Sequence, residues 1–105
     1  IGHGSMICSN VLINNNTTIG SHCLINSSCS LDHDNNLENF SSTAPRVVTG
    51  GNVFIKKNSF IGIGSIIKNR ITIGNNTIIG GSSFVTKDCL SNSTYVGSPA
   101  KKIKN

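Results

Sequence analysis

Aliphatic side chains return at every sixth position along most of the chain. Reading from Ile1, thirteen of the fifteen positions are aliphatic, and the two exceptions, Thr43 and Thr49, are neighbours in the series. A helix would give a period of 3.6 and an ordinary strand a period of two, so a period of six indicates neither. The aliphatic positions are Ile1, Ile7, Ile13, Ile19, Ile25, Leu31, Leu37, Ile55, Ile61, Ile67, Ile73, Ile79 and Val85.

A second residue, small or β-branched in almost every case, lies four positions after each of these. One large and one small inward side chain per hexad predicts short strands joined by tight corners, and a repeat of this kind decides the whole fold. Three hexads form one triangular coil of eighteen residues. The fifteen hexads therefore predict an all-β solenoid of five coils, at residues 1–18, 19–36, 37–54, 55–72 and 73–90.

The repeat also sets the domain organisation. Residues 1–90 form the repeat domain, in which neighbouring coils pair at the parallel-strand spacing of about 4.8 Å and stability is close to a sum over neighbours. The last fifteen residues, 91–105, break the repeat and are expected to cover the C-terminal edge, since bare strand edges need covering. The N-terminal edge has no such cover and Ile1 is already in phase, so we expect an upstream domain to be missing.

Composition agrees with this reading. Aromatic residues are 5% of the chain and Trp is absent, so the core must be filled by many small and aliphatic side chains. The fifteen Asn and eleven Gly residues both tolerate left-handed backbone, which many tight turns require.

The distribution of charge and cysteine argues against several classes of protein. The net charge is +5 and the basic residues cluster late, but no aromatic platform accompanies them, so a phosphorylated small molecule is favoured over nucleic acid. The four cysteines form no CxxC pair and are interpreted as reduced residues of a cytoplasmic, bacterial protein. No apolar run reaches about 18 residues, which predicts no membrane-spanning helix.

Several segments carry a more specific resemblance. They are Asn26–Asp34, with its Asp-His-Asp corner, Gly50–Ile55, Phe60–Ser65 and the Gly-Ser-Pro-Ala-Lys run that ends at Lys101. With the hexads, they resemble the left-handed parallel β-helix acyltransferases, and among these the family of sialic acid O-acetyltransferases and bacillosamine-pathway N-acetyltransferases. The left-handed coil is implied by this resemblance and runs against the usual right-handed crossover rule.

The resemblance implies a reaction and its residues. It implies acetyl-CoA as co-substrate, no metal, and a nucleotide-sugar-binding domain upstream of the β-helix. His33 matches the general base, Asp32 and Asp34 match acidic residues that assist it, and Asn26 matches a sugar-contacting residue.

The same resemblance places an acetyl-CoA site at Ser42, Ile63 and Gly81. The chain departs from the family at Ser42, where a second His is common, which leaves His-based polarisation of the thioester there in doubt.

The residues themselves fit acyl transfer. Histidine titrates near neutrality and suits a base, and a flanking carboxylate can fix its tautomer and favour the imidazolium. Gly51 lies one coil beyond His33 in the same column, so we expect open space beside the imidazole where a backbone N–H can approach the cofactor. Lys101 and the lysines after it are either a solvated tail or contacts for the CoA phosphates.

Column arithmetic predicts an assembly. His33 and Gly51 fall on one corner of the triangle, whereas Ile63 and Gly81 fall on another. These corners are too far apart to touch one thioester in a single chain. The sequence therefore predicts a homotrimer with active sites between subunits.

Other functions remain to be weighed. An acyltransferase of the same fold acting on serine or another non-sugar acceptor is the main rival. A zinc-dependent carbonic-anhydrase-like protein would need three converging histidines, but His3, His22 and His33 fall in different columns. An ice-binding β-helix would need a regular Thr array, which is missing. No nucleophile elbow is present, so direct transfer is favoured over an acyl-enzyme.

Overall fold

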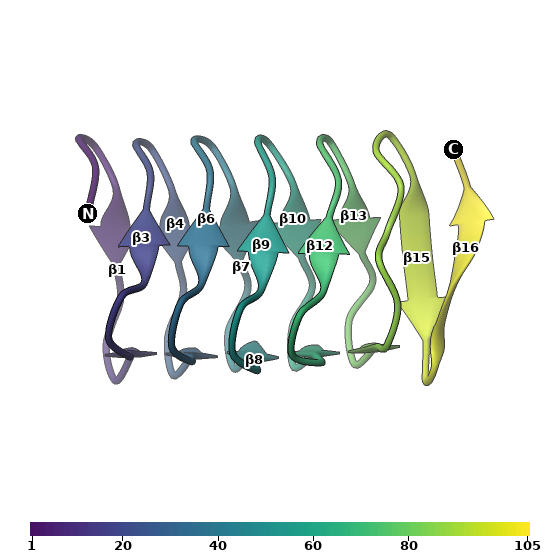
Figure 1. The fold of residues 1–105 in the computed structure, drawn as a ribbon, viewed down its shortest axis with the longest axis horizontal. Helices are drawn as coiled ribbons and strands as arrows, with labels where there is room; N and C mark the ends of the chain where they lie inside the picture. The colour runs from purple at the N-terminus through teal and green to yellow at the C-terminus, as the bar shows by residue number, and fades with distance from the viewer.

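The computed structural model describes residues 1–105 as a single β-solenoid whose coils stack along one axis (Figure 1). Fourteen strands of two residues recur every six residues, and two longer strands follow them. The strands are β1 (Met6–Ile7), β2 (Leu12–Ile13), β3 (Thr18–Ile19), β4 (Leu24–Ile25), β5 (Ser30–Leu31), β6 (Asn36–Leu37), β7 (Ser42–Thr43), β8 (Val48–Thr49), β9 (Phe54–Ile55), β10 (Phe60–Ile61), β11 (Ile66–Ile67), β12 (Thr72–Ile73), β13 (Ile78–Ile79), β14 (Phe84–Val85), β15 (Thr94–Gly97) and β16 (Ala100–Lys104).

Every third strand joins the same parallel sheet, so the solenoid has three faces. Sheet A has the order β1-β4-β7-β10-β13-β15-β16, sheet B has β14-β11-β8-β5-β2, and sheet C has β12-β9-β6-β3. In Figure 1 the near strands of sheet C run upward, the chain crosses to the far strands of sheet A, and each new coil lies further to the right. This path is left-handed, which confirms the predicted handedness.

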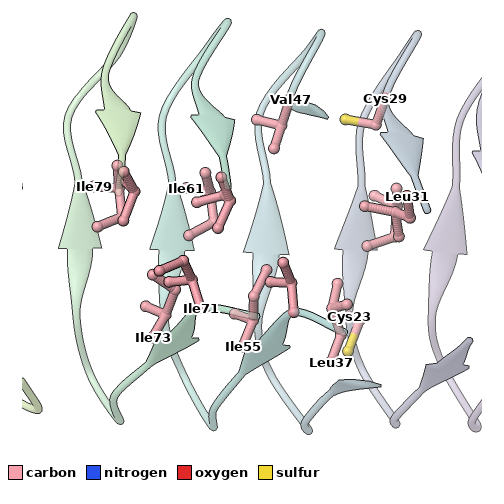
Figure 2. Close-up of a cluster of buried hydrophobic side chains, with 14 of the residues drawn as sticks. Cys23, Cys29, Leu31, Leu37, Val47, Ile55, Ile61, Ile71, Ile73 and Ile79 are labelled. Carbon is pink, nitrogen blue, oxygen red and sulfur yellow. The ribbon is translucent and has the colours of Figure 1, made fainter. Parts of the chain in front are cut away.

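Most of the predicted inward residues form the core, whereas Ile1 is 79% exposed and Ile7 and Ile13 are partly buried. Ile25, Leu31, Ile55, Ile61 and other aliphatic positions of the hexads have no exposed surface. Figure 2 shows Leu37, Ile55 and Ile73 in successive coils of the solenoid, together with the buried cysteines Cys23 and Cys29. Because each coil adds the same small set of side chains, the core needs no large aromatic residue. Thr43 and Thr49, which interrupt the aliphatic series, point inward as well and are 1% and 2% exposed.

The corners explain the abundance of Asn. One residue in almost every corner has a φ near +60°, as in Asn16, His22 and Asp34. Asn and Asp tolerate this left-handed conformation because their short side chains bond locally. The local sequence therefore helps each corner to turn.

The C-terminal residues continue one sheet before they leave the repeat. Strand β15 pairs in parallel with β13, with Ile78 opposite Thr94, and β16 folds back antiparallel to β15. The expected break after residue 90 is therefore gradual, because sheet A gains one more strand and then a hairpin that covers its edge. Lys101 lies on this hairpin, opposite Val96.

The cysteines are free, as predicted, and three of them are buried. Burial, and then the negative charge of Asp88, raises the pKa of the Cys89 thiol from 9.0 to about 12. Its neutral form therefore adds stability that is complete below pH 9.0 and is lost as the pH rises towards 12.

The three faces differ in polarity. Sheet C shows polar side chains outward apart from Phe54, whereas sheets A and B each carry a line of exposed apolar side chains. We call them the sheet A ridge and the sheet B ridge. The sheet A ridge is Met6, Leu24, Phe60 and Ile78, and the sheet B ridge is Leu12, Val48, Ile66 and Phe84.

No helix in the structure is long and apolar enough to cross a membrane.

Candidate active site

The Asp32-His33-Asp34 turn lies at the corner between sheets B and C. Strand β5 ends at Leu31 and β6 begins at Asn36, so the three residues occupy the corner itself. The backbone N–H of Asp34 donates to the carbonyl of Asn15 in the previous coil at 3.1 Å, and the carbonyl of His33 accepts from Asn52 in the next coil at 3.0 Å. The turn is therefore bonded to the coils on both sides.

The imidazole of His33 forms a hydrogen bond with one of the two neighbouring acids. Its Nδ1 lies 2.9 Å from Oδ2 of Asp34, and the two side chains are 48% and 46% exposed. A carboxylate at this distance favours the tautomer with the proton on Nδ1. The lone pair of Nε2 is then free to take a proton from a ligand, which is the arrangement that a general base needs.

Asp32 contacts backbone rather than the imidazole. Its Oδ1 accepts the N–H of His33 at 2.8 Å and Nδ2 of Asn14 at 3.3 Å. This carboxylate therefore stabilises the backbone at the start of the turn and links it to the previous coil. Of the two predicted acidic neighbours, only Asp34 contacts the ring of His33.

Gly51 lies under the imidazole, in the predicted column. A Cβ placed on Gly51 would lie 2.5 Å from both Cε1 and Nε2 of His33. The expectation of open space beside the ring is wrong, because the ring itself occupies the space that the missing side chain leaves. Gly51 is therefore needed for the observed position of His33.

The other predicted site residues lie elsewhere on the chain. Asn26, Ile63 and Gly81 belong to the corner between sheets A and B, where a Cβ on Gly81 would lie 3.1 Å from Cγ2 of Ile63. Ser42 begins β7 and pairs with Phe60 on sheet A. Within one chain, none of these residues is brought to His33.

No pocket forms at His33 within one chain. The structure has one shallow polar depression, on sheet C and its corner with sheet A. It is lined by Thr18, Gly20, Asn36, Leu37, Glu38, Asn39 and Lys57. There is also no group of three or more His, Cys, Asp and Glu side chains arranged to hold a metal ion.

Sequence reasoning missed two features of the His33 corner. The first is a group of basic residues, Lys68, Arg70 and Lys87, which lie on the same corner two and three coils beyond His33, in three adjacent columns; together we call them the basic column. The sequence shows a late cluster of basic residues, but only the eighteen-residue register places three of them on this corner. The second is the buried pair Asn35 and Thr49, which lies beneath the turn.

Comparison with known proteins supports the acyltransferase class that the sequence resemblance implies. The family model for the bacterial transferase hexapeptide (six repeats) matches residues 52–87. A Schizosaccharomyces pombe protein that carries the name acetyltransferase is 38% identical over 66 residues, which is 63% of this chain and 32% of that protein.

Two solved structures share the fold over nearly the whole chain. The acetyltransferase domain of PglB from Neisseria gonorrhoeae, in complex with acetyl coenzyme A, has a TM-score of 0.95 and 25% identity, with 98% of this chain and 51% of that chain covered. A histidine-to-alanine mutant of GDP-perosamine N-acetyl transferase from Caulobacter crescentus, in complex with CoA and GDP-perosamine, has a TM-score of 0.90 and 26% identity, with 100% and 53% covered.

The repeat, the coil and these likenesses define the fold as a left-handed β-helix of hexapeptide repeats, which is the fold that the sequence resemblance implied, and the chain is similar over nearly its whole length to domains of acetyltransferases. Its structural neighbours include an N-acetyltransferase of a nucleotide sugar. The chain spans about a third of the yeast relative (32%) and about half of each structure (51% and 53%).

Proposed function

We propose that this chain is the catalytic domain of an acetyl-CoA-dependent acetyltransferase that acetylates an amino or hydroxyl group of a sugar, such as a nucleotide amino sugar or a sialic acid. The observation that carries the proposal is the 2.9 Å contact between His33 and Asp34, which leaves Nε2 of His33 available as a base. The names and ligands of the structural neighbours support both acetyl-CoA and a sugar acceptor. The free cysteines support a cytoplasmic location.

The proposed reaction is one direct transfer. Nε2 of His33 takes the proton from the acceptor nitrogen or oxygen as that atom attacks the thioester carbonyl. The new bond to the acyl carbon forms, the carbon–sulfur bond breaks, and the departing CoA sulfur takes up a proton. Asp34 stabilises the imidazolium that forms in between. No acyl-enzyme is needed, and burial keeps the raised-pKa thiol of Cys89 protonated and unreactive.

We infer that sheet B faces a threefold axis. The catalytic turn lies at one edge of sheet B, and Ile63 and Gly81 lie at its other edge. If three chains turn sheet B towards a common axis, the His33 corner of each chain meets the Ile63 corner of the next. The sheet B ridge, whose residues are between 38% and 59% exposed, then becomes the apolar core of the trimer.

The assembly has a direct test. Replacing Ile66 of the sheet B ridge with Glu would place three carboxylates around the axis, where they repel one another and resist burial. We expect light scattering to give three times the chain mass of 11.1 kDa for the wild type and a single chain mass for Ile66→Glu. Thr18→Glu, at the same hexad position on polar sheet C, should remain trimeric. A monomeric wild type, or a trimeric Ile66→Glu, would rule out this arrangement.

The position of the basic column indicates the direction in which bound acetyl-CoA would extend from His33, which is towards the C-terminal coils. Coils are about 4.8 Å apart, so Lys68 and Arg70 lie about 10 Å from His33 along the corner and Lys87 about 14 Å from it. The pantetheine arm of CoA spans about 15 Å if it has the extended dimensions of a peptide chain. With the thioester at His33, the phosphates of CoA would reach the basic column. Lys101, on the hairpin at the same end of the solenoid, is a further candidate contact.

The activity is tested by CoA release from acetyl-CoA with a panel of acceptors. We expect thiol release with nucleotide amino sugars or sialic acids and none with serine, because the neighbours with known ligands include a nucleotide-sugar enzyme. Mass spectrometry of the product would distinguish N- from O-acetylation. Release with serine alone would favour the rival acceptor class, and no release with any acceptor would contradict the proposal for this chain.

A further inference from the structure

Two buried polar side chains interrupt the core directly beneath the His33 turn. Asn35 is 1% exposed and Thr49 is 2% exposed. In the same columns, the next residues are apolar, with Val53 after Asn35 and Ile67 after Thr49, while Thr17 precedes Asn35 and Leu31 precedes Thr49. A polar group at such a place is costly unless it is fully bonded, so its partners indicate what it does.

Asn35 holds the two sides of the corner together. Its Nδ2 donates to the carbonyl of His33 at 3.2 Å and to the carbonyl of Gly50 in the next coil at 3.0 Å. Gly50 precedes Gly51, on which the imidazole rests. One amide group therefore links the backbone of His33 to the backbone that supports its ring.

Thr49 completes the network from the next coil. Its Oγ1 donates to Oδ1 of Asn35 and accepts the backbone N–H of Asp32 at 3.2 Å. The carbonyl of Asp32 accepts from Thr17 at 2.7 Å. Every backbone polar group of Asp32 and His33 thus has a named partner.

Comparison with other corners shows which hydrogen bonds of this network recur along the solenoid and which occur only at the His33 turn. Thr17 bonds a corner carbonyl fifteen residues ahead and an N–H eighteen residues ahead, and Ser59 does the same at 2.5 Å and 3.0 Å. The hydroxyl of Thr17 is therefore a feature of the repeat. Asn35 is the only buried side-chain amide in the chain, and it lies at the corner that carries the contact between His33 and Asp34.

We propose that Asn35 and Thr49 are positioning residues, which fix the Asp32–Asp34 turn so that Nδ1 of His33 faces Asp34 and Nε2 faces the acceptor. This inference rests on the proposed role of His33 as the base. Asn35 and Thr49 interrupt the apolar inward positions at this corner. With apolar residues in their place, only the hydrogen bonds that recur at other corners would hold the turn.

The test is the double variant Asn35→Val/Thr49→Val, which restores the apolar pattern. Replacing both partners leaves neither side chain unsatisfied, whereas the N–H of Asp32 and the carbonyl of Gly50 lose Thr49 and Asn35 as partners, so the double variant should melt below the wild type but above Thr49→Val. Thr49→Val alone should melt lower, because Oδ1 of Asn35 loses its donor. Thr43→Val is the matched control: it is the other hydroxyl in an aliphatic position, and its Oγ1 meets only the sulfur of Cys29.

For the stable double variant we expect kcat to fall about ten- to a hundredfold, as misplaced catalytic groups do, with the KM for acetyl-CoA unchanged and Thr43→Val unaffected. Ring ¹⁵N NMR of His33 should show the Nδ1-protonated tautomer in the wild type and a mixture in the double variant. A folded double variant with wild-type kcat and wild-type ring shifts would overturn the proposal. If His33→Ala is fully active, the base assignment fails, and the ring shifts still decide whether the pair positions His33.

Discussion

Replacing His33 with Ala is expected to lower kcat for acceptor-dependent CoA release by about 10² to 10⁴-fold, the usual contribution of a general base. The reason is the free Nε2, which is the one basic atom that the corner presents beside a carboxylate partner. The measurement is kcat from thiol release at saturating acetyl-CoA and acceptor. The KM for acetyl-CoA should change little, because the base acts mainly on the transition state.

The controls use matched positions. His22 is also a corner histidine, but its ring stacks on Phe40 with centroids 5.1 Å apart, so His22→Ala should keep full activity. Asp34→Asn tests the contact between His33 and Asp34 alone, because Asn tolerates the left-handed φ of 56° at this position. It should lower kcat by about tenfold or more, since the imidazolium loses its counter-charge. Full activity in His33→Ala would mean that another group takes the proton.

Gly51→Ala should lower the proposed acceptor-dependent CoA release to a similar extent, although it adds only one methyl group. The new Cβ would lie 2.5 Å from Cε1 and Nε2 of His33, closer than real Cβ contacts allow. The half-exposed ring can move away, so the melting temperature should change little. Moving it breaks the contact with Asp34 and turns Nε2 from the acceptor, which should lower kcat by about a hundredfold.

A double-mutant cycle identifies the cause of that loss. If Gly51→Ala acts through the imidazole, it should have almost no further effect in a His33→Ala background, because the affected group is already gone. Ring NMR should also report a changed environment for His33 in Gly51→Ala. A loss of activity that adds fully to that of His33→Ala would instead assign Gly51 an independent role, such as direct contact with the donor.

The fold could be predicted almost completely because each hexad repeats the same pattern of one large and one small inward side chain with a tight corner. The aliphatic positions, the stacking of His33 over Gly51 and the buried cysteines all follow from counting residues. The C-terminal hairpin could not be predicted in this way, since β15 pairs sixteen residues after β13 rather than eighteen. A short deletion of this kind preserves the sheet but hides the repeat.

The site was harder to predict than the coil. The sequence indicated Asp32 and Asp34 equally, and only the geometry of the turn assigns Asp34 to the ring and Asp32 to the backbone. Thr49 appeared only as an exception to the aliphatic series. Its partner Asn35 is fourteen residues earlier, a spacing that has no meaning until the coils are closed. Residues that hold a site from inside the core are recognised mainly by such exceptions.

Because the repeat is uninterrupted, distances along each edge of the solenoid are multiples of the spacing between coils. An insertion of eighteen residues between Gly51 and Lys68 would lengthen the path from the base to the basic column by about 4.8 Å and keep both on one edge. An insertion of six residues would rotate everything downstream onto another face. Along one edge, the separation between the base and the basic residues can therefore change only in whole coils, by insertion or deletion of eighteen residues at a time.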